Sequence, residues 1–203
     1  MRLRSILRAA PGPTLDAALE SDSDAVLFRL TDESSPVADL RRGVLDAIGR
    51  VSDAGKAALV TVNHPRTQLA RGDLEAIVTS HLSAVILPHC VEPQNVRDVT
   101  VLLREFEYTR GIEPGEIALF PMIDTARGLL RVAESIDAAP RTAGLVFSSD
   151  VYAGDIGARV EEKGARLSYA RGAVIAAARA YDRLPLVDGS YLELREMANY
   201  GFA

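Results

Sequence analysis

Short hydrophobic runs alternate with longer amphipathic segments along the chain. Most of the runs are continuously apolar, without a polar residue at every second position. Continuous runs are typical of strands buried on both faces, as in a parallel sheet covered by helices. We expect seven such strands, at Ser5–Pro11, Asp24–Leu30, Ala57–Asn63, Ala84–Cys90, Glu116–Ile123, Ala143–Ser149 and Leu184–Gly189.

The intervening segments carry helix signals. Asp39–Gly55 ends at a glycine, a common residue at helix C-termini. Asp73–Leu82 begins with an acid suited to an N-cap. Pro93–Gly111 has a proline near its start and a glycine at its end. Leu167–Asp182 is rich in alanine, the strongest helix former.

Alternating strands and helices predict βαβ units. The sequence has no GxGxxG phosphate-binding motif, so the pattern favours a (β/α) barrel over a dinucleotide-binding sheet. The 203 residues contain no low-complexity linker. We therefore expect a single barrel domain over residues 1–203.

Charge and composition exclude several classes of protein. The net charge is −5 and the pI about 5.3, which argues against nucleic-acid and membrane-surface partners, because both need a basic patch. No apolar run reaches the roughly 18 residues that span a bilayer. The single cysteine, Cys90, cannot form an internal disulfide, so we expect a cytoplasmic protein. Neither lysine, Lys56 or Lys163, lies in an apolar run, which argues against Schiff-base catalysis.

Polar residues lie at the C-terminal ends of five of the expected strands or directly after them. The active site of a (β/α) barrel lies at the C-terminal ends of its strands, so we expect these side chains to converge on one face. They are Arg29, Asn63, His64, Arg66, His89, Asp124 and Asp150.

Asp124 and Asp150 suggest a magnesium site. Mg²⁺ takes oxygen ligands and needs only one or two protein carboxylates besides water and substrate oxygens. Asp124 also directly precedes a helix-like segment, "TARGLL", where an acid could instead cap the helix N-terminus. Asp150 has the same two interpretations, and the sequence leaves both open.

The histidines also allow two interpretations. His64 and His89 could transfer protons or bind a ligand, or they could be neutral, hydrogen-bonded residues at strand ends. His81 is expected inside a helix, without a role. Cys90 follows His89 directly, and neighbouring residues on a strand point to opposite faces. A buried thiol is therefore expected at Cys90, and not a Cys–His nucleophile pair.

Several segments together resemble the HpcH/HpaI aldolase and citrate lyase β-subunit family, as a divergent member. They occur in the family's order and span nearly the whole chain. They are "RSILRAAPG", "DAVLFRLTDE", "VTVNHPRT", "AVILPHCVEPQNVRDV", "PMIDTARGLL", "GLVFSSDVYAGDIGAR" and "ARGAVIAAARAYDRLPLVDG".

The resemblance implies a (β/α)₈ barrel of the phosphoenolpyruvate/pyruvate type that binds Mg²⁺ and makes or breaks a carbon–carbon bond. Its typical substrates are citryl-, malyl- or citramalyl-CoA thioesters. By resemblance, the metal-binding glutamate of the family falls on Asp124, which is one methylene shorter, and its metal-binding aspartate falls on Asp150.

The sequence also departs from the family pattern. Arg29 and Thr31 replace acids, so that only Asp32 remains of an acidic stretch, and Thr61 takes the place of a substrate-orienting arginine. The chain ends about where the eighth strand would begin. A barrel without that strand has two open edges, so we expect either a homo-oligomer or a subunit of a larger complex.

Two functions follow from these observations. The first is a Mg²⁺-dependent lyase or thioesterase acting on a hydroxyacyl-CoA or a related keto or hydroxy acid. Asp124 and Asp150 would hold the metal, Arg66, Arg29 and Asn63 would bind substrate, and His64 or His89 would transfer a proton. The second is a catalytically degenerate relative that serves as a binding or structural subunit, since function depends on the site and not on the fold.

Overall fold

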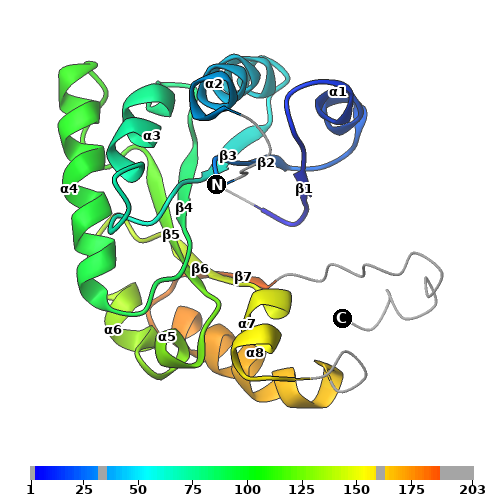
Figure 1. Ribbon diagram of the computed structural model, residues 1–203, viewed down its shortest axis with the longest axis vertical. Helices are drawn as coiled ribbons and strands as arrows, with labels where there is room; N and C mark the ends of the chain where they lie inside the picture. The colour runs from blue at the N-terminus through cyan, green and yellow to red at the C-terminus, as the bar shows by residue number, and fades with distance from the viewer. Residues whose placement is uncertain (1–2, 32–35, 159–162, 188–203) are drawn as a thin grey trace.

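The chain forms a curled, entirely parallel sheet with helices on its outer side (Figure 1). The computed structural model describes residues 3–31, 36–158 and 163–187. In this part of the chain the sheet has seven strands in sequential order, β1 to β7. They are β1 (Ile6–Arg8), β2 (Ala25–Arg29), β3 (Ala57–Thr61), β4 (Ala84–Leu87), β5 (Ala118–Ile123), β6 (Gly144–Phe147) and β7 (Leu184–Val187).

Helices connect each strand to the next. Figure 1 shows α2 to α4 along one part of the outer side and α5 to α8 along the other. The described helices are α1 (Pro13–Glu20), α2 (Val37–Asp53), α3 (Ala70–Ile77), α4 (Pro93–Thr109), α5 (Ala126–Leu130), α6 (Val132–Ile136), α7 (Ser149–Asp155) and α8 (Lys163–Ala180). The expected parallel βαβ architecture is confirmed.

The sheet is buried on both faces. Alternate strand residues, among them Leu59, Ile86 and Phe120, form one apolar cluster on the inner side of the curl. Their neighbours, such as Val60 and Val85, belong to a second cluster that includes residues of α1 to α4. Both sets are almost fully excluded from solvent. This explains why the strands are continuously apolar in sequence.

Helix ends agree in part with the sequence signals. Gly55 and Gly111 have left-handed backbones, with φ of 73° and 67°, just beyond α2 and α4, as expected of helix-terminating glycines. The expected N-cap role of Asp73 is wrong, because α3 begins at Ala70 and Asp73 lies in its first turn. His81 is not helical either, since α3 ends at Ile77 and His81 lies in the following turn.

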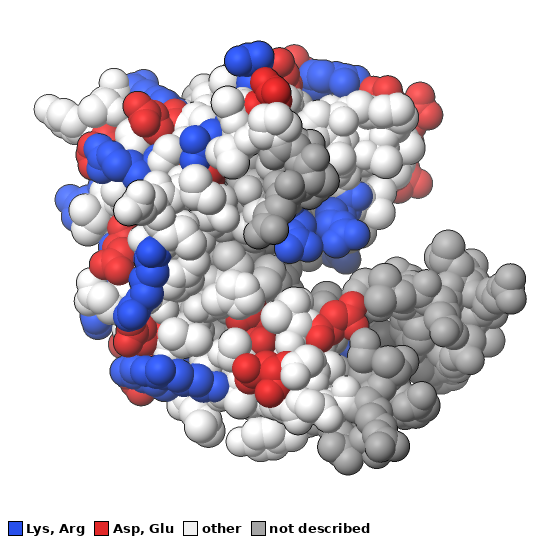
Figure 2. Space-filling view, in the orientation of Figure 1, with Lys and Arg blue, Asp and Glu red and all other residues white. Residues whose placement is uncertain are grey.

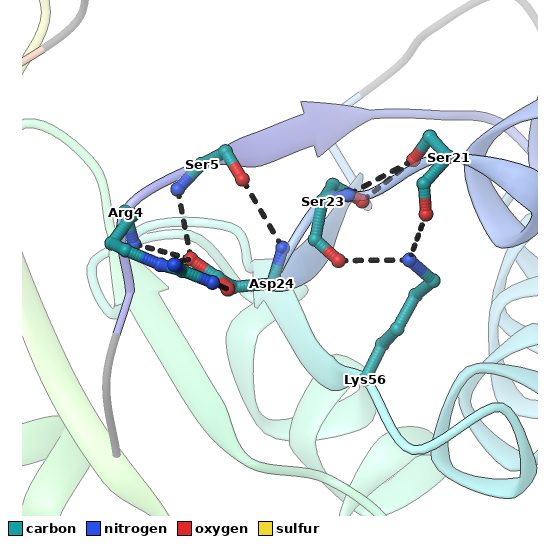
Figure 3. Close-up of polar contacts among 6 residues, drawn as sticks. All are labelled: Arg4, Ser5, Ser21, Ser23, Asp24 and Lys56. Atoms are coloured by element: carbon teal, nitrogen blue, oxygen red, sulfur yellow. Dashed lines mark hydrogen bonds and ion pairs between the residues drawn. The ribbon is translucent and has the colours of Figure 1, made fainter.

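The N-terminal ends of the strands are held by a polar network (Figure 3). Asp24 accepts hydrogen bonds from the backbone and side chain of Arg4. The Nζ atom of Lys56 donates to the carbonyl oxygens of Ser21 and Ser23, at 2.5 and 2.8 Å. Lys56 therefore anchors the start of β3, at the opposite end of the strand from the expected site.

In the described sheet, β1 and β7 are the outermost strands. The expectation about the eighth strand concerns residues beyond 187, which lie outside the described residues, as does Asp32. None of the helices in the described ranges is long and apolar enough to cross a membrane.

Candidate functional site

The expected site residues fall into separate groups at the C-terminal ends of the strands. His64, Arg66 and His89 line one cavity of about 240 Å³, together with Val91, Glu92 and Arg127. Arg29 lines a different cavity, of about 540 Å³, beside β1 and β2.

Asp124 is a buried acid of this face. It directly follows β5, and only 1% of its surface is exposed. Its Oδ2 atom accepts the backbone N–H of His89 at 2.9 Å and lies 3.1 Å from the Nδ1 atom of the same residue. Its Oδ1 atom is buried without a hydrogen-bond partner. Burial raises the pKa of this carboxyl group, partly offset by its contacts with His89.

Asp124 is not the cap of the helix that follows it. The N-cap of α5 is Thr125, whose hydroxyl accepts the backbone N–H of Gly128 at 3.0 Å. The capping interpretation of Asp124 is therefore wrong. A threonine is a good N-cap itself, so the carboxylate is left available for another role.

His89 has a left-handed backbone, with φ of 51°. Such a conformation is uncommon for a residue other than glycine and often occurs at functional sites. The next residue, Cys90, is buried and donates its N–H to the carbonyl oxygen of Met122. Burial raises the pKa of the Cys90 thiol to about 11. The thiol is therefore the inert, buried group that the sequence indicated.

His64 lines the smaller cavity and is half-buried. Its Nδ1 atom accepts the backbone N–H of Arg66 at 3.2 Å, which places the proton of the neutral ring on Nε2. That Nε2 atom is buried without a hydrogen-bond partner. Burial is the largest cause of the lowered pKa of His64, so the ring is neutral at neutral pH.

Arg66 is engaged with an acid that the sequence did not single out as a site residue. Its guanidinium forms an ion pair with Glu92, which also lies 4.0 Å from Arg131. Glu92 is the N-cap of α4, where Asn95 accepts its backbone N–H. The sequence signal was the proline at the start of this helix, with an acid before it. Arg127, exposed in α5, completes the basic rim of the cavity.

Asn63 takes part in a structural network. Its amide nitrogen donates to Asp73 at 2.8 Å and to the carbonyl oxygen of Leu30 at 3.1 Å. Asp73 is fully buried and also binds Arg41. This network ties the ends of β2 and β3 to α2 and α3. The side-chain amide nitrogen of Asn63 is therefore already occupied by hydrogen bonds within the protein.

Asp150 lies on the neighbouring strand end. β5 and β6 pair through Ile123 and Phe147, and Asp150 follows in the first turn of α7, where it is exposed. No group of three or more His, Cys, Asp or Glu side chains within the described ranges could hold a metal. The buried, unpartnered oxygen of Asp124 fits Mg²⁺ held by one or two carboxylates and water. It does not fit a cage made of protein ligands alone.

Residues 10–195 match the HpcH/HpaI aldolase/citrate lyase family. The chain belongs to this family. The prediction of the family is thus confirmed, and the match covers most of the chain.

Curated relatives fall into two groups. The chain is 28% identical over 184 residues to a (3S)-malyl-CoA thioesterase of Cereibacter sphaeroides strain KD131, covering 90% of this chain and 60% of the relative. It is 25% identical over 216 residues to the citrate lyase subunit beta of Leuconostoc mesenteroides subsp. cremoris, covering 99% of this chain and 71% of the relative. The chain thus spans about three fifths of the length of the malyl-CoA thioesterases.

Solved structures support the fold. The citrate lyase beta subunit from M. tuberculosis, complexed with oxaloacetate and magnesium, has a TM-score of 0.70 at 20% identity and covers 96% of this chain and 81% of its own. The Haloferax volcanii malate synthase has a TM-score of 0.82 at 13% identity and covers 98% of this chain and 64% of its own. At these identities the similarity shows the fold alone: the curled sheet has a barrel-like arrangement.

Proposed function

We propose that the chain is a Mg²⁺-dependent lyase or thioesterase acting on a hydroxyacyl-CoA, such as a malyl-, citramalyl- or citryl-CoA thioester, or on a related hydroxy or keto acid. Its sheet would be part of a barrel of the phosphoenolpyruvate/pyruvate type. Family membership supports this class of reaction, as do the names of the related malyl-CoA thioesterases and citrate lyase beta subunits. The single observation that carries the proposal is Asp124, a buried carboxylate with one unpartnered oxygen at the end of β5.

Asp124 would be the main ligand of the metal, and Asp150 on the next strand end would be the second. A buried carboxylate with an unsatisfied oxygen costs free energy, so its presence is better explained by a ligand than by stability. When bound, Mg²⁺ supplies Lewis-acid stabilisation of the negative charge that develops on a substrate oxygen.

The protein side chains would position the substrate and transfer protons. His64 is neutral because of its burial, and its Nε2 atom has no hydrogen-bond partner, so Nε2–H can donate to a substrate oxygen. His89 lies beside the same cavity with its Nδ1 atom near Asp124. Arg66 and Arg127 would attract the carboxylate or thioester end of the substrate.

A second function is favoured by the contacts of these same residues. Arg66 is paired with Glu92 and Asn63 with Asp73, so both are already engaged. A catalytically degenerate family member, acting as a binding or structural subunit, would keep such contacts without turnover. Self-association or assembly with another chain would use β1 and β7, the outermost strands of the sheet in the described ranges.

The test combines metal binding with turnover. Wild type, D124N, D150N and the matched surface control D46N, which changes an exposed acid on α2, are heated with Mg²⁺ or with EDTA. The proposal expects Mg²⁺ to raise the melting temperature of wild type and D46N, but not of D124N. Hydrolysis or cleavage of malyl-CoA and citramalyl-CoA is then assayed.

The two functions give different outcomes. A Mg²⁺ response that depends on Asp124, together with product formation, supports the enzyme. A Mg²⁺ response without turnover of either thioester would support the degenerate relative. A melting temperature that does not respond to Mg²⁺ in any variant would rule out the metal site, and the lyase with it.

A further inference from the structure

The larger cavity, beside β1 and β2, is lined by two arginines and by no acid among residues 3–31, 36–158 and 163–187. It measures about 540 Å³ and is lined by Arg8, Arg29, Thr14 and Thr31, with Ala9, Leu40 and Val44 among its apolar residues. Small-molecule sites usually measure about 300–1,000 Å³ and combine apolar walls with a few polar groups. The size and lining of this cavity meet both conditions.

Strand register places both arginines on the same face of the sheet. Arg8 pairs with Leu27, and Arg29 lies two residues further along β2. Because side chains alternate along a strand, Arg8 shares the face of Ile6 and Arg29 that of Leu27. Ile6 and Leu27 both pack against the inner apolar cluster. Both arginine side chains therefore start from the inner face of the sheet, at the C-terminal ends of β1 and β2.

The charge of these arginines is uncompensated in the described part of the chain. Neither Arg8 nor Arg29 is among the ten ion pairs formed there. Arg29 uses its Nε atom to donate to the hydroxyl of Thr31 at 3.3 Å. This contact holds the guanidinium at its Nε atom, and neither terminal nitrogen has a hydrogen bond to another described residue. The hydroxyl of Thr14 is already bonded to Ala10, so the arginines are the main donors.

The surface around the cavity carries opposite charges on its two sides. Figure 2 shows a hollow whose wall beside β1, beneath α1, is covered by Lys and Arg side chains. Asp and Glu side chains gather on the opposite wall, over α7, where Asp150 and Asp155 are exposed. An anion entering the hollow is therefore drawn to the arginine wall and repelled by the acidic one.

We propose that Arg8 and Arg29 form a binding site for a small oxyanion, held by the two guanidinium groups in the cavity between β1, β2 and α2. Guanidinium groups bind carboxylate and phosphate oxygens through paired, charge-assisted hydrogen bonds. The shared chemistry is an anionic group with several oxygens, on a dicarboxylic acid or on a phosphate. This site goes beyond the proposed lyase function and requires neither metal nor turnover.

The test is calorimetric titration with succinate and with inorganic phosphate, in EDTA and at constant ionic strength set by sodium chloride. Wild type is compared with R8Q and R29Q, and with R104Q, which removes an exposed arginine of α4 outside the cavity. We expect wild type and R104Q to bind at least one of the anions. R8Q and R29Q should weaken that binding by about tenfold or more. The anion that wild type binds more tightly shows whether the site prefers a dicarboxylic acid or a phosphate.

Two results would overturn the proposal: no binding of either anion by wild type, or binding of unchanged affinity in both glutamine variants. Far-UV circular dichroism verifies that each variant is folded. If a glutamine variant does not fold, R8K and R29K replace it, because lysine keeps the charge but not the two-pronged donor. Weaker binding in the lysine variants supports the site, and unchanged affinity contradicts it. Because EDTA is present throughout, failure of the metal site does not affect this outcome.

Discussion

The backbone N–H and the Nδ1 atom of His89 both approach one oxygen of Asp124, at 2.9 and 3.1 Å. The other carboxylate oxygen is buried without a partner. The contacts between His89 and Asp124 connect the ends of β4 and β5, and the second carboxylate oxygen is left open to a ligand. This arrangement also makes two stability predictions possible, one for each residue.

Asp124→Asn should leave the protein at least as stable as wild type at neutral pH, because the buried carboxyl group no longer has to ionise. Burial raises the pKa of Asp124 above its ordinary value. The group therefore binds its proton more tightly in the folded state, and stability is lost as pH rises through the folded pKa. Asparagine cannot ionise and removes this loss. Urea unfolding at pH 4 to 7 measures the difference.

The matching control for Asp124→Asn is D46N, which should follow the wild-type pH dependence throughout. If D124N instead unfolds more readily than wild type at neutral pH, the carboxylate is a stabilising residue. The ligand role proposed for it would then lose its energetic argument.

His89→Gly should be more stable than His89→Ala by about 1 kcal/mol, because alanine keeps the cost of a left-handed backbone and glycine does not. Both variants lose the imidazole contact with Asp124, so their difference isolates the backbone. Guanidinium unfolding of the two variants measures it. Equal stabilities would mean that the loop relaxes to another conformation once the imidazole is removed.

The sequence predicted the sheet well because burial on both faces leaves a direct signature. The inner residue Leu59 and the outer residue Val60 are adjacent and both buried, so β3 had to be apolar throughout. For the helix after β5, the sequence left open whether Asp124 caps the helix or binds a metal. Which side chain caps it depends on backbone dihedrals, and those place Thr125, and not Asp124, at the N-cap.

Contacts between distant segments could not be predicted from the pattern. Aspartate is a common helix cap, which is why Asp73 was expected to cap a helix. In the structure it is buried, and its carboxylate binds Arg41 and Asn63 from two other segments. In the same way, Arg66 and Arg29 are both basic residues near the C-terminal ends of strands. Only the three-dimensional structure separates them into two cavities, one with Glu92 and one with Arg8.

His64→Gln should reduce the loss of stability that occurs on acidification. Burial lowers the folded pKa of His64 below its ordinary value of about 6.5. The unfolded chain therefore binds protons more readily, and stability falls as pH decreases from about 6.5 through the folded pKa. Glutamine does not titrate. The slope of unfolding free energy against pH, from urea titrations at pH 5 to 7.5, should be steeper in wild type. Identical slopes would contradict a neutral, buried His64.

Arg141→Ala should cost about 3–5 kcal/mol of unfolding free energy. The guanidinium of Arg141 forms two hydrogen bonds to Glu107, at 3.0 and 2.7 Å, and both side chains are almost fully buried. Removal of one partner leaves an uncompensated buried charge. The double variant R141M/E107L should lose much less unfolding free energy than the sum of the losses in R141M and in E107L. Urea unfolding of these three variants and wild type forms the double-mutant cycle that tests this. Strict additivity would mean that the pair is not coupled.

Gly128→Ala should destabilise the protein by about 1–3 kcal/mol. A Cβ atom at this position would lie 2.5 Å from the carbonyl oxygen of Cys90, and Cys90 is fixed by its hydrogen bond to Met122. The new methyl group must therefore displace the segment that carries His89 or the start of α5. Gly154 in α7 is the matched control, because a Cβ there meets nothing within 4 Å. Gly154→Ala should be neutral or stabilising by up to about 1 kcal/mol. Guanidinium unfolding compares the two variants. Equal stabilities would show that the close approach of α5 to the loop after β4 does not constrain this side of the cavity.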